Sequence, residues 1–202
     1  NVKNLTSHDK GNTFKIIMEQ LKNVGYYVKF KILDTCKITG IPQHRERIYM
    51  VGFLDKNLYE QFNFDFPNIE LKPVTDFLES NVNQRFYYTE KLKVYDEVKK
   101  EITKHISTNT FYQYRRYYVR ENKSNCCPTL TANMGSGGHN VPLLLDDVGI
   151  RKLTPRECFN LQGFPNNYQL PNISDSKLYK LAGNAVSIPV IEKVVEQIIK
   201  LI

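Results

Sequence analysis

The segment that most constrains the fold runs from residue 13 to residue 53 and has the pattern helix, strand, loop, strand. Apolar side chains recur on one helical face from Thr13 to Val24, and Gly25 stands where a helix C-cap belongs. Residues 28–32 then alternate apolar side chains with lysines, which predicts a half-buried strand. A second strand is expected over the apolar run 48–53. This order is typical of an α/β sheet.

The rest of the chain alternates between segments without periodicity and segments with helix or strand patterns. Residues 1–12 are polar and predict a loop, while residues 55–88 show no clear periodicity. A helix is expected over 89–106, followed from residue 111 by short apolar runs typical of a small β-rich unit. A capping box at 154–157 begins a helix that should stop at Gly163, and a closing helix is expected over 189–201.

Composition and charge narrow the classes of function. No apolar stretch approaches the roughly 20 residues of a membrane span, and 41% hydrophobic residues are ordinary for a soluble domain, so a cytoplasmic protein is expected. The net charge of +7 suits a polyanionic partner. The cysteines show no metal-ligand spacing, and we expect no metal site and four reduced thiols: Cys36, Cys126, Cys127 and Cys158.

Three short motifs carry chemical information. In Gln43-His44-Arg45-Glu46-Arg47 the two arginines alternate, so an extended backbone places both guanidinium groups on one side, where they can hold phosphate or a base oxygen. A charged loop edge with solvated arginines is the alternative. The segment Arg151 to Cys158, continuing to Gly163-Phe164-Pro165, is interpreted as a well-capped structural helix.

The third motif is Gly183-Asn184-Ala185-Val186, between two helices. Its glycine lets the backbone approach a small ligand closely, although in isolation a plain turn between helices is the favoured interpretation.

Together and in this order, the motifs resemble those of the cytosine-5 DNA methyltransferases. The family pattern has Gln-x-Arg-x-Arg, a variable target-recognition region, Arg-x-Leu-Thr-x-Arg-Glu-Cys with Gly-Phe-Pro, and a closing Gly-Asn-x-Val. The opening Asn1-Val2 is similar to the end of the family's Glu-Asn-Val motif. The resemblance covers the whole chain and weakens between about 55 and 125.

The resemblance implies an activity. A cysteine thiolate attacks carbon 6 of a flipped-out cytosine, and carbon 5 takes the methyl group of S-adenosylmethionine. Arg45 and Arg47 are then expected on the active-site wall with Gln43 in support, and Asn1 would orient the catalytic loop. Asn184, Ala185 and Val186 are expected at the methionine end of the cofactor. Arg156 and Glu157 are expected to hold the two lobes together.

The family's catalytic motif and the glycine-rich loop of its cofactor domain are missing from these residues. The family's nucleophile lies in a Pro-Cys pair, and the chain has only the reverse order, Cys127-Pro128. We therefore expect a chain that is inactive alone, and a missing N-terminal half or partner subunit. Without the first strands of the domain an apolar face would be uncovered, so self-association or marginal stability is also expected.

The variable region is expected to read double-stranded DNA. Arginine offers a two-pronged donor to guanine or phosphate, tyrosines give a stiff surface, and glycines let backbone approach bases. The alternative for the Tyr/Arg stretch is an amphipathic strand with a solvated basic face. The tyrosines concerned are Tyr112, Tyr114, Tyr117 and Tyr118. The expected DNA-binding residues besides Gln43 are Arg115, Arg116, Arg120, Lys123, Thr129, Leu130, Gly135, Gly137 and Gly138.

The fold class follows as α/β: the trailing part of a Rossmann-like methyltransferase domain with an inserted, small β-containing target-recognition domain. The methyltransferase part is expected over residues 1–54 and 151–202, and the recognition domain over 55–150. The expected function is site recognition and completion of a cytosine-5 methyltransferase active site, within a restriction–modification system. A free-standing DNA-binding module without catalysis and an RNA methyltransferase of the same fold are the alternatives.

Overall fold

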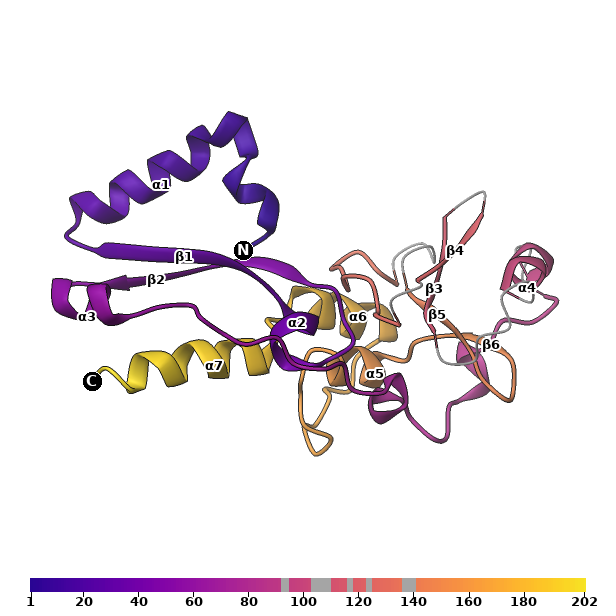
Figure 1. Cartoon of the computed structure of the whole chain (residues 1–202). Coiled ribbons are helices and arrows are strands. Elements are labelled where there is room, and N and C mark those ends of the chain that lie inside the picture. Colours follow the sequence, from indigo (N-terminus) through magenta and orange to yellow (C-terminus); the bar gives the residue numbers. More distant parts are fainter. Residues whose placement is uncertain (92–94, 103–109, 116–117, 123–124, 136–140) are drawn as a thin grey trace.

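The computed structural model describes residues 1–91, 95–102, 110–115, 118–122, 125–135 and 141–202. One end of the molecule is a two-stranded antiparallel sheet of β1 (Tyr27–Asp34) and β2 (Glu46–Phe53), in which Tyr27 pairs with Phe53 and Asp34 with Glu46. Helix α1 (Asn12–Asn23) lies along one face of this pair, and α7 (Ile188–Ile199) lies on the other (Figure 1). These elements confirm the predicted helix, the two strands and the closing helix.

The apolar core of this end is built from distant parts of the chain. Leu33 and Phe53 of the strands pack with Phe62, from the segment after α3 (Lys56–Gln61), and with Val190 and Val194 of α7. The face toward α1 is much less covered. No side chain of α1 is buried, and Phe30 of β1 is 46% exposed although its ring meets that of Phe14 edge-on.

The opposite end holds the β-rich unit that the sequence predicted. Four short antiparallel strands lie in the order β4-β3-β5-β6, with bounds β3 (Tyr112–Tyr114), β4 (Val119–Glu121), β5 (Leu143–Leu145) and β6 (Ile150–Lys152). Helix α4 (Tyr95–Ile102) packs on this sheet through Val98 and Ile102. The expected helix over 89–106 is therefore shorter at its start, since residues 89–91 are not helical. Its positions 92–94 and 103–106 lie outside the described residues.

The middle of the molecule joins the two ends (Figure 1). The short helix α2 (Thr35–Thr39) lies between β1 and β2 in the chain. Helices α5 (Pro155–Asn160) and α6 (Asp175–Asn184) pack together beside the recognition region. Their shared core includes Ile41, Leu130 and Tyr179. The predicted capping box is confirmed: Glu157 N donates to Thr154 Oγ1 at 3.1 Å, and Thr154 N donates to Glu157 Oε2 at 2.8 Å.

One local expectation was wrong, and a segment without clear periodicity contains short helices. Residues 1–12 do not form a simple loop, because they include the 3-10 turns η1 (Lys3–Thr6) and η2 (His8–Gly11). Within η2, Asp9 and Lys10 take positive φ, a conformation that a polarity pattern does not reveal. The region 55–88 also contains α3 and two further 3-10 turns, η3 (Val74–Phe77) and η4 (Gln84–Phe86). Across the described residues, no helix is both long and apolar enough to cross a membrane.

Candidate functional site

The first arginine of the Gln-x-Arg-x-Arg motif is buried and connects separate parts of the chain. Arg45 is 4% exposed, and its Nη1 donates to Leu130 O at 2.8 Å. Its Nη2 donates to Gly183 O at 3.0 Å and to Ala185 O at 2.6 Å. Burial, together with the positive charge of Arg47, lowers the pKa of Arg45 to about 10. In this structure Arg45, directly before β2, thus contacts the loop of residues 125–135 (the recognition loop) and the end of α6. It does not face an open surface.

Gln43 occupies a similar position. Its side chain is fully buried, with Nε2 donating to Leu161 O at 2.7 Å and Oε1 accepting from Leu130 N at 3.3 Å. Next to it the backbone pairs with residues 127–129, since Cys127 N donates to Pro42 O at 2.7 Å and His44 N donates to Cys127 O at 2.8 Å. Gln43 therefore holds the recognition loop rather than presenting its amide to a ligand.

The second arginine differs from the first because it borders a hollow. Arg47 is half-buried and donates through Nη1 to Glu46 O at 2.8 Å. The hollow has a volume of about 520 Å³ and is lined by Val2, Lys3, Asn4, Asp34, Lys37, His44, Glu46, Arg47 and Thr129. Burial lowers the pKa of Arg47, but at neutral pH its guanidinium stays charged. Arg47 is therefore the motif arginine that can reach a bound group.

The opening residues lie directly beside Arg47. Val2 forms an antiparallel bridge with Arg47, and Asn1 exchanges backbone hydrogen bonds with Ile48 at 3.0 and 2.9 Å. Asn1 Oδ1 accepts from Val2 N at 2.7 Å. The structure thus brings together two motifs that are more than 40 residues apart in the sequence, the Asn-Val pair and the motif arginine.

A second hollow adjoins the first. It has a volume of about 510 Å³ and is lined by His44, Gln113, Arg115, Arg120, Asn122, Cys126, Pro128, Thr129, Thr131 and Asn133. His44 and Thr129 line both hollows, and Thr129 Oγ1 donates to His44 O at 2.6 Å across the shared wall. Arg47 thus stands in the first hollow, and Arg115 and Arg120 stand in the second.

The Tyr/Arg stretch separates into two faces. Tyr112 and Tyr114 are buried, and Tyr114 Oη donates to Glu97 Oε2 at 3.0 Å, so these two tyrosines are core residues and not the contact surface expected of them. Arg115, Arg120 and Tyr118 are exposed. Strand alternation explains the division, because neighbouring side chains point to opposite faces. Arg116, Tyr117 and Lys123 lie outside the described residues, as do Gly137 and Gly138.

In the recognition loop, Thr129 and Leu130 have different surroundings. Leu130 is fully buried and offers no side-chain surface to DNA in this structure, whereas the neighbouring Thr129 lines both hollows. Gly135 has φ +79°, and a Cβ there would lie 2.5 Å from Tyr179 Cδ2. The glycine thus lets the loop pack against α6, which is a different use of its small size from the expected approach to bases.

The Gly-Asn-Ala-Val segment ends α6 beside Arg45. Ala185 accepts a hydrogen bond from Arg45 through its carbonyl, while Asn184 and Val186 are exposed. None of these three residues lines either of the two hollows described above. An exposed amide and an exposed apolar side chain at a helix end leave room for a ligand on this side of Arg45.

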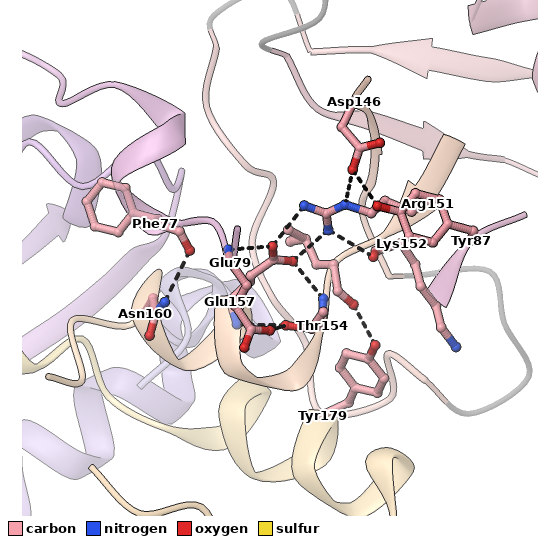
Figure 2. Close-up of polar contacts among 11 residues, drawn as sticks. Phe77, Glu79, Tyr87, Asp146, Arg151, Lys152, Thr154, Glu157, Asn160 and Tyr179 are labelled. Carbon is pink, nitrogen blue, oxygen red and sulfur yellow. Dashed lines mark hydrogen bonds and ion pairs between the residues drawn. The ribbon is translucent and has the colours of Figure 1, made fainter. Parts of the chain in front are cut away.

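A buried ionic network lies at the start of α5 (Figure 2). Arg151 donates to Glu157 through Nη1 at 2.8 Å and Nη2 at 2.9 Å, and through Nε to Asp146 at 2.6 Å. Glu157 Oε1 also accepts from Glu79 N at 3.0 Å. Figure 2 shows these groups converging from β6, α5 and the segment before Tyr87. The sequence singled out Glu157, but nothing in the local pattern indicated Glu79 or Asp146.

Arg156 has a different role from Glu157. Its Nη2 donates to Tyr168 O at 2.6 Å, so it ties α5 to the loop that follows this helix.

Comparison with known proteins gives a consistent result. Residues 1–200 match the family described as C-5 cytosine-specific DNA methylase. Type II methyltransferase M.Bsp6I of Bacillus sp. strain RFL6 is 52% identical over 203 residues, covering 99% of this chain and 64% of that protein. Type II methyltransferase M1.ScrFI of Lactococcus lactis subsp. cremoris is 35% identical, covering 100% of this chain and 51% of that protein. The chain thus spans less than two thirds of the length of these relatives.

Solved structures show the same fold. The Schizosaccharomyces pombe (S. pombe) Dnmt2 methyltransferase matches with a TM-score of 0.68 at 17% identity, over 99% of this chain and 64% of that one. The Entamoeba histolytica methyltransferase EhMeth matches with a TM-score of 0.67 at 19% identity, over 93% of this chain and 58% of that one. The α/β fold class expected from the sequence is confirmed by these neighbours.

Proposed function

This chain belongs to the C-5 cytosine-specific DNA methylase family, and from that premise we propose that it recognises a DNA site and completes a methyl-transfer site. The reaction is transfer of a methyl group from S-adenosylmethionine to carbon 5 of cytosine. The observation that carries the proposal is the pair of adjoining hollows, with Arg47 in one and Arg115 and Arg120 in the other. Cytosine must leave the base stack to react, and such a pair accommodates the flipped base and the neighbouring duplex separately.

Arg47 is the residue of this chain that we assign to the flipped nucleotide. Its guanidinium stays protonated and offers several donors, which suits a base oxygen or a flanking phosphate. Arg45 holds the wall behind it by donating to three backbone carbonyls. Arg115 and Arg120 then contact phosphates or guanine edges of the recognised site, with Thr129 at the boundary.

Three of the chain's four thiols do not suit the role of nucleophile. Attack on a base requires a thiolate, and burial raises the pKa of both Cys127 and Cys158, while a hydrogen bond to Cys126 and burial raise that of Cys36. No Pro-Cys pair occurs in the 202 residues. We therefore propose that these residues alone do not methylate DNA, and that the nucleophile comes from a further segment or a partner chain.

The end of α6 is the part of the chain that we assign to the cofactor. The exposed amide of Asn184 can exchange hydrogen bonds with a polar group, and the exposed side chain of Val186 can pack on an apolar one. S-adenosylmethionine, when bound, supplies the methyl group. Buried Ser187 Oγ, which has no hydrogen-bond partner among the described residues, lies directly after this segment and fits a polar ligand at this helix end.

We propose the same division into two domains that the sequence indicates. Residues 55–150 form the target-recognition domain, and residues 1–54 and 151–202 form part of the methyltransferase domain. Helices α5 and α6 stand at the boundary, because their core is shared with Phe111 and Leu130 of the recognition domain. We place the protein in a restriction–modification system, acting in the cytoplasm on double-stranded DNA.

The test is transfer of labelled methyl groups to unmethylated DNA of mixed sequence. The chain is assayed alone and then with a separately produced segment that carries the Pro-Cys and Glu-Asn-Val motifs of a relative. Activity only in the mixture is expected, and the methylated positions then identify the recognised site. Site-specific DNA binding without methyl transfer in the mixture would instead identify a free-standing DNA-binding module, and transfer to RNA in place of DNA would overturn the substrate assignment.

A further inference from the structure

Two cysteines and a histidine meet at the wall between the two hollows. Cys36 comes from α2, His44 from the segment before β2, and Cys126 from the recognition loop. Their ligand atoms all lie within 4.8 Å of one another, and Cys36 Sγ is 3.2 Å from His44 Nδ1. Cys126 is 90 residues away from Cys36 along the chain, so sequence spacing gave no sign of this cluster.

A carboxylate adjoins the same nitrogen. Asp34 Oδ2 lies 3.2 Å from His44 Nδ1, while Asp34 Oδ1 accepts from Arg45 N at 2.9 Å. A cation at the centre of the cluster would have donor atoms of all of these groups around it.

The donor set and its spacing suit a soft divalent cation. Zinc binds thiolate sulfur at about 2.3 Å and imidazole nitrogen at about 2.0–2.1 Å, so ligand atoms of a tetrahedral site lie roughly 3.5–3.8 Å apart. The observed separations, from 3.2 Å to no more than 4.8 Å, need only small side-chain movements to reach that geometry. Thiolate ligands favour zinc over magnesium or calcium, which bind oxygen.

The surroundings support the same assignment. Cys36 and Cys126 are buried and His44 is exposed, so the sulfur side of the cluster is enclosed and the imidazole side is open. The backbone is fixed on both sides of the cluster, because Cys127, next to Cys126, exchanges hydrogen bonds with Pro42 and His44.

We propose that Cys36, His44 and Cys126 bind one zinc ion, with Asp34 or water as the fourth ligand. Binding displaces the thiol protons to solvent and leaves two thiolates on the metal. Cys126 belongs to the recognition loop, whereas Cys36 and His44 come from α2 and the segment before β2. The ion therefore fixes that loop beside His44, which lines both hollows. This site goes beyond the proposed methyl transfer, and its test does not depend on that activity.

The experiment uses the full chain under reducing conditions, with Zn²⁺ and Co²⁺ as probes. One equivalent of zinc per chain should survive dialysis against a weak chelator. Co²⁺ should give the intense sulfur-to-metal absorption of a site with two thiolates and the visible bands of tetrahedral cobalt. The urea midpoint should rise with zinc, because the metal binds only the folded chain tightly. Cys36→Ser and Cys126→Ser should each weaken the sulfur band and abolish the zinc-dependent rise.

Two further variants keep the test decisive. Cys127→Ser is the matched control, because its buried thiol donates to Pro128 O and faces away from the cluster, so zinc binding should be unchanged. His44→Gln alters the exposed ligand and leaves both buried thiols in place, so it should fold and still lose chelator-resistant zinc. The proposal is overturned if the reduced chain retains no zinc, or if Cys127→Ser loses as much zinc as Cys36→Ser. Retention of zinc by His44→Gln at the wild-type level would also overturn it.

Discussion

Arg151 and Glu157 face one another as a two-point ion pair, with Nη1 to Oε2 at 2.8 Å and Nη2 to Oε1 at 2.9 Å. Both side chains are almost completely buried, at 2% and 0% exposure. Burying two charges is costly, and the cost is offset here because the remaining lone pairs of Glu157 accept from the backbone of Thr154 and Glu79. The pair therefore belongs to one network that spans β6, α5 and the segment around residue 79.

The first prediction concerns Glu157→Gln. The substitution leaves Arg151 charged and buried with only Asp146 as an acidic partner, and it places an amide N–H where donors already converge. We expect the free energy of unfolding to fall by about 3–5 kcal/mol, as for other buried pairs that lose one partner. Urea denaturation followed by circular dichroism measures this. Arg85→Ala is the control, because Arg85 pairs with Asp175 at an exposed site and should cost no more than about 1 kcal/mol.

The second prediction is a pH dependence that runs through Asp146. Burial opposes ionisation of this carboxylate, but hydrogen bonds from Arg151, the Gly149 and Val148 amides and Tyr87 outweigh it and lower its pKa. The folded state therefore binds the proton less tightly than the unfolded state, whose value is about 3.9. The contribution to stability is complete above that value and is lost as the pH falls through the lower, folded-state pKa. Asp146→Asn should remove this part of the acid dependence, which denaturation curves below about pH 4 will show. Equal acid dependence of the two proteins would contradict the assignment.

The third prediction separates the two motif arginines. Arg45→Ala leaves three buried carbonyls without their donor, so the free energy of unfolding should fall by at least about 2 kcal/mol. Arg47→Ala removes a half-buried side chain that borders the first hollow, and unfolding should change by less than about 1 kcal/mol. Methyl transfer by the complemented enzyme should nevertheless fall strongly for Arg47→Ala. If the two variants lose stability equally, the division of roles is incorrect.

The fourth prediction tests the contact between α6 and the recognition loop. A Cβ at Gly183 would lie 2.2 Å from the Thr131 carbonyl atoms and 2.5 Å from Ala132 N. Alanine would otherwise favour the helix by up to about 1 kcal/mol, but the clash is with backbone and cannot relax by a side-chain rotation. Gly183→Ala should therefore lower the free energy of unfolding by about 1–3 kcal/mol. Lys180→Ala, on the exposed side of the same helix, should change it by less than about 0.5 kcal/mol.

The fifth prediction concerns the second hollow. Arg120→Gln should weaken DNA binding and reduce the slope of log K against log salt by about 0.9 if the contact is to a phosphate. If the contact is to guanine, recognition at one base pair should relax at nearly the same slope. Lys200→Gln makes the same change of charge on an exposed residue directly after α7 and should have little effect. Fluorescence anisotropy over a salt series distinguishes these outcomes, and equal losses for both variants would indicate binding through net charge alone.

Local patterns predicted the local structure well. The helix, the two strands, the capping box at Thr154 and the closing helix all depend on residues within a few positions of one another. Periodicity and cap chemistry act over that range, so they can be read directly. The turns of residues 3–11 escaped prediction because their positive φ values arise at Asp9 and Lys10, where polarity alone is uninformative.

The roles of the motif residues depended on contacts that no local pattern records. Alternation predicted that Arg45 and Arg47 share one side of an extended backbone, but the acceptors that bury Arg45 come from Leu130, Gly183 and Ala185. Those partners are 85 to 140 residues away. The cluster of Cys36, His44 and Cys126 was missed for the same reason.

The core around Leu33 and Phe62 also constrains how the protein is made. It closes only when Val190 and Val194 pack on it, and these residues follow Leu33 by more than 150 positions along the chain. Domains usually fold in the order in which they are synthesised, but β1 and β2 must wait here until translation has passed through the whole recognition region. A nonsense codon at the start of α7 would therefore spare every motif residue and still leave β1 and β2 without the side chains that close their core.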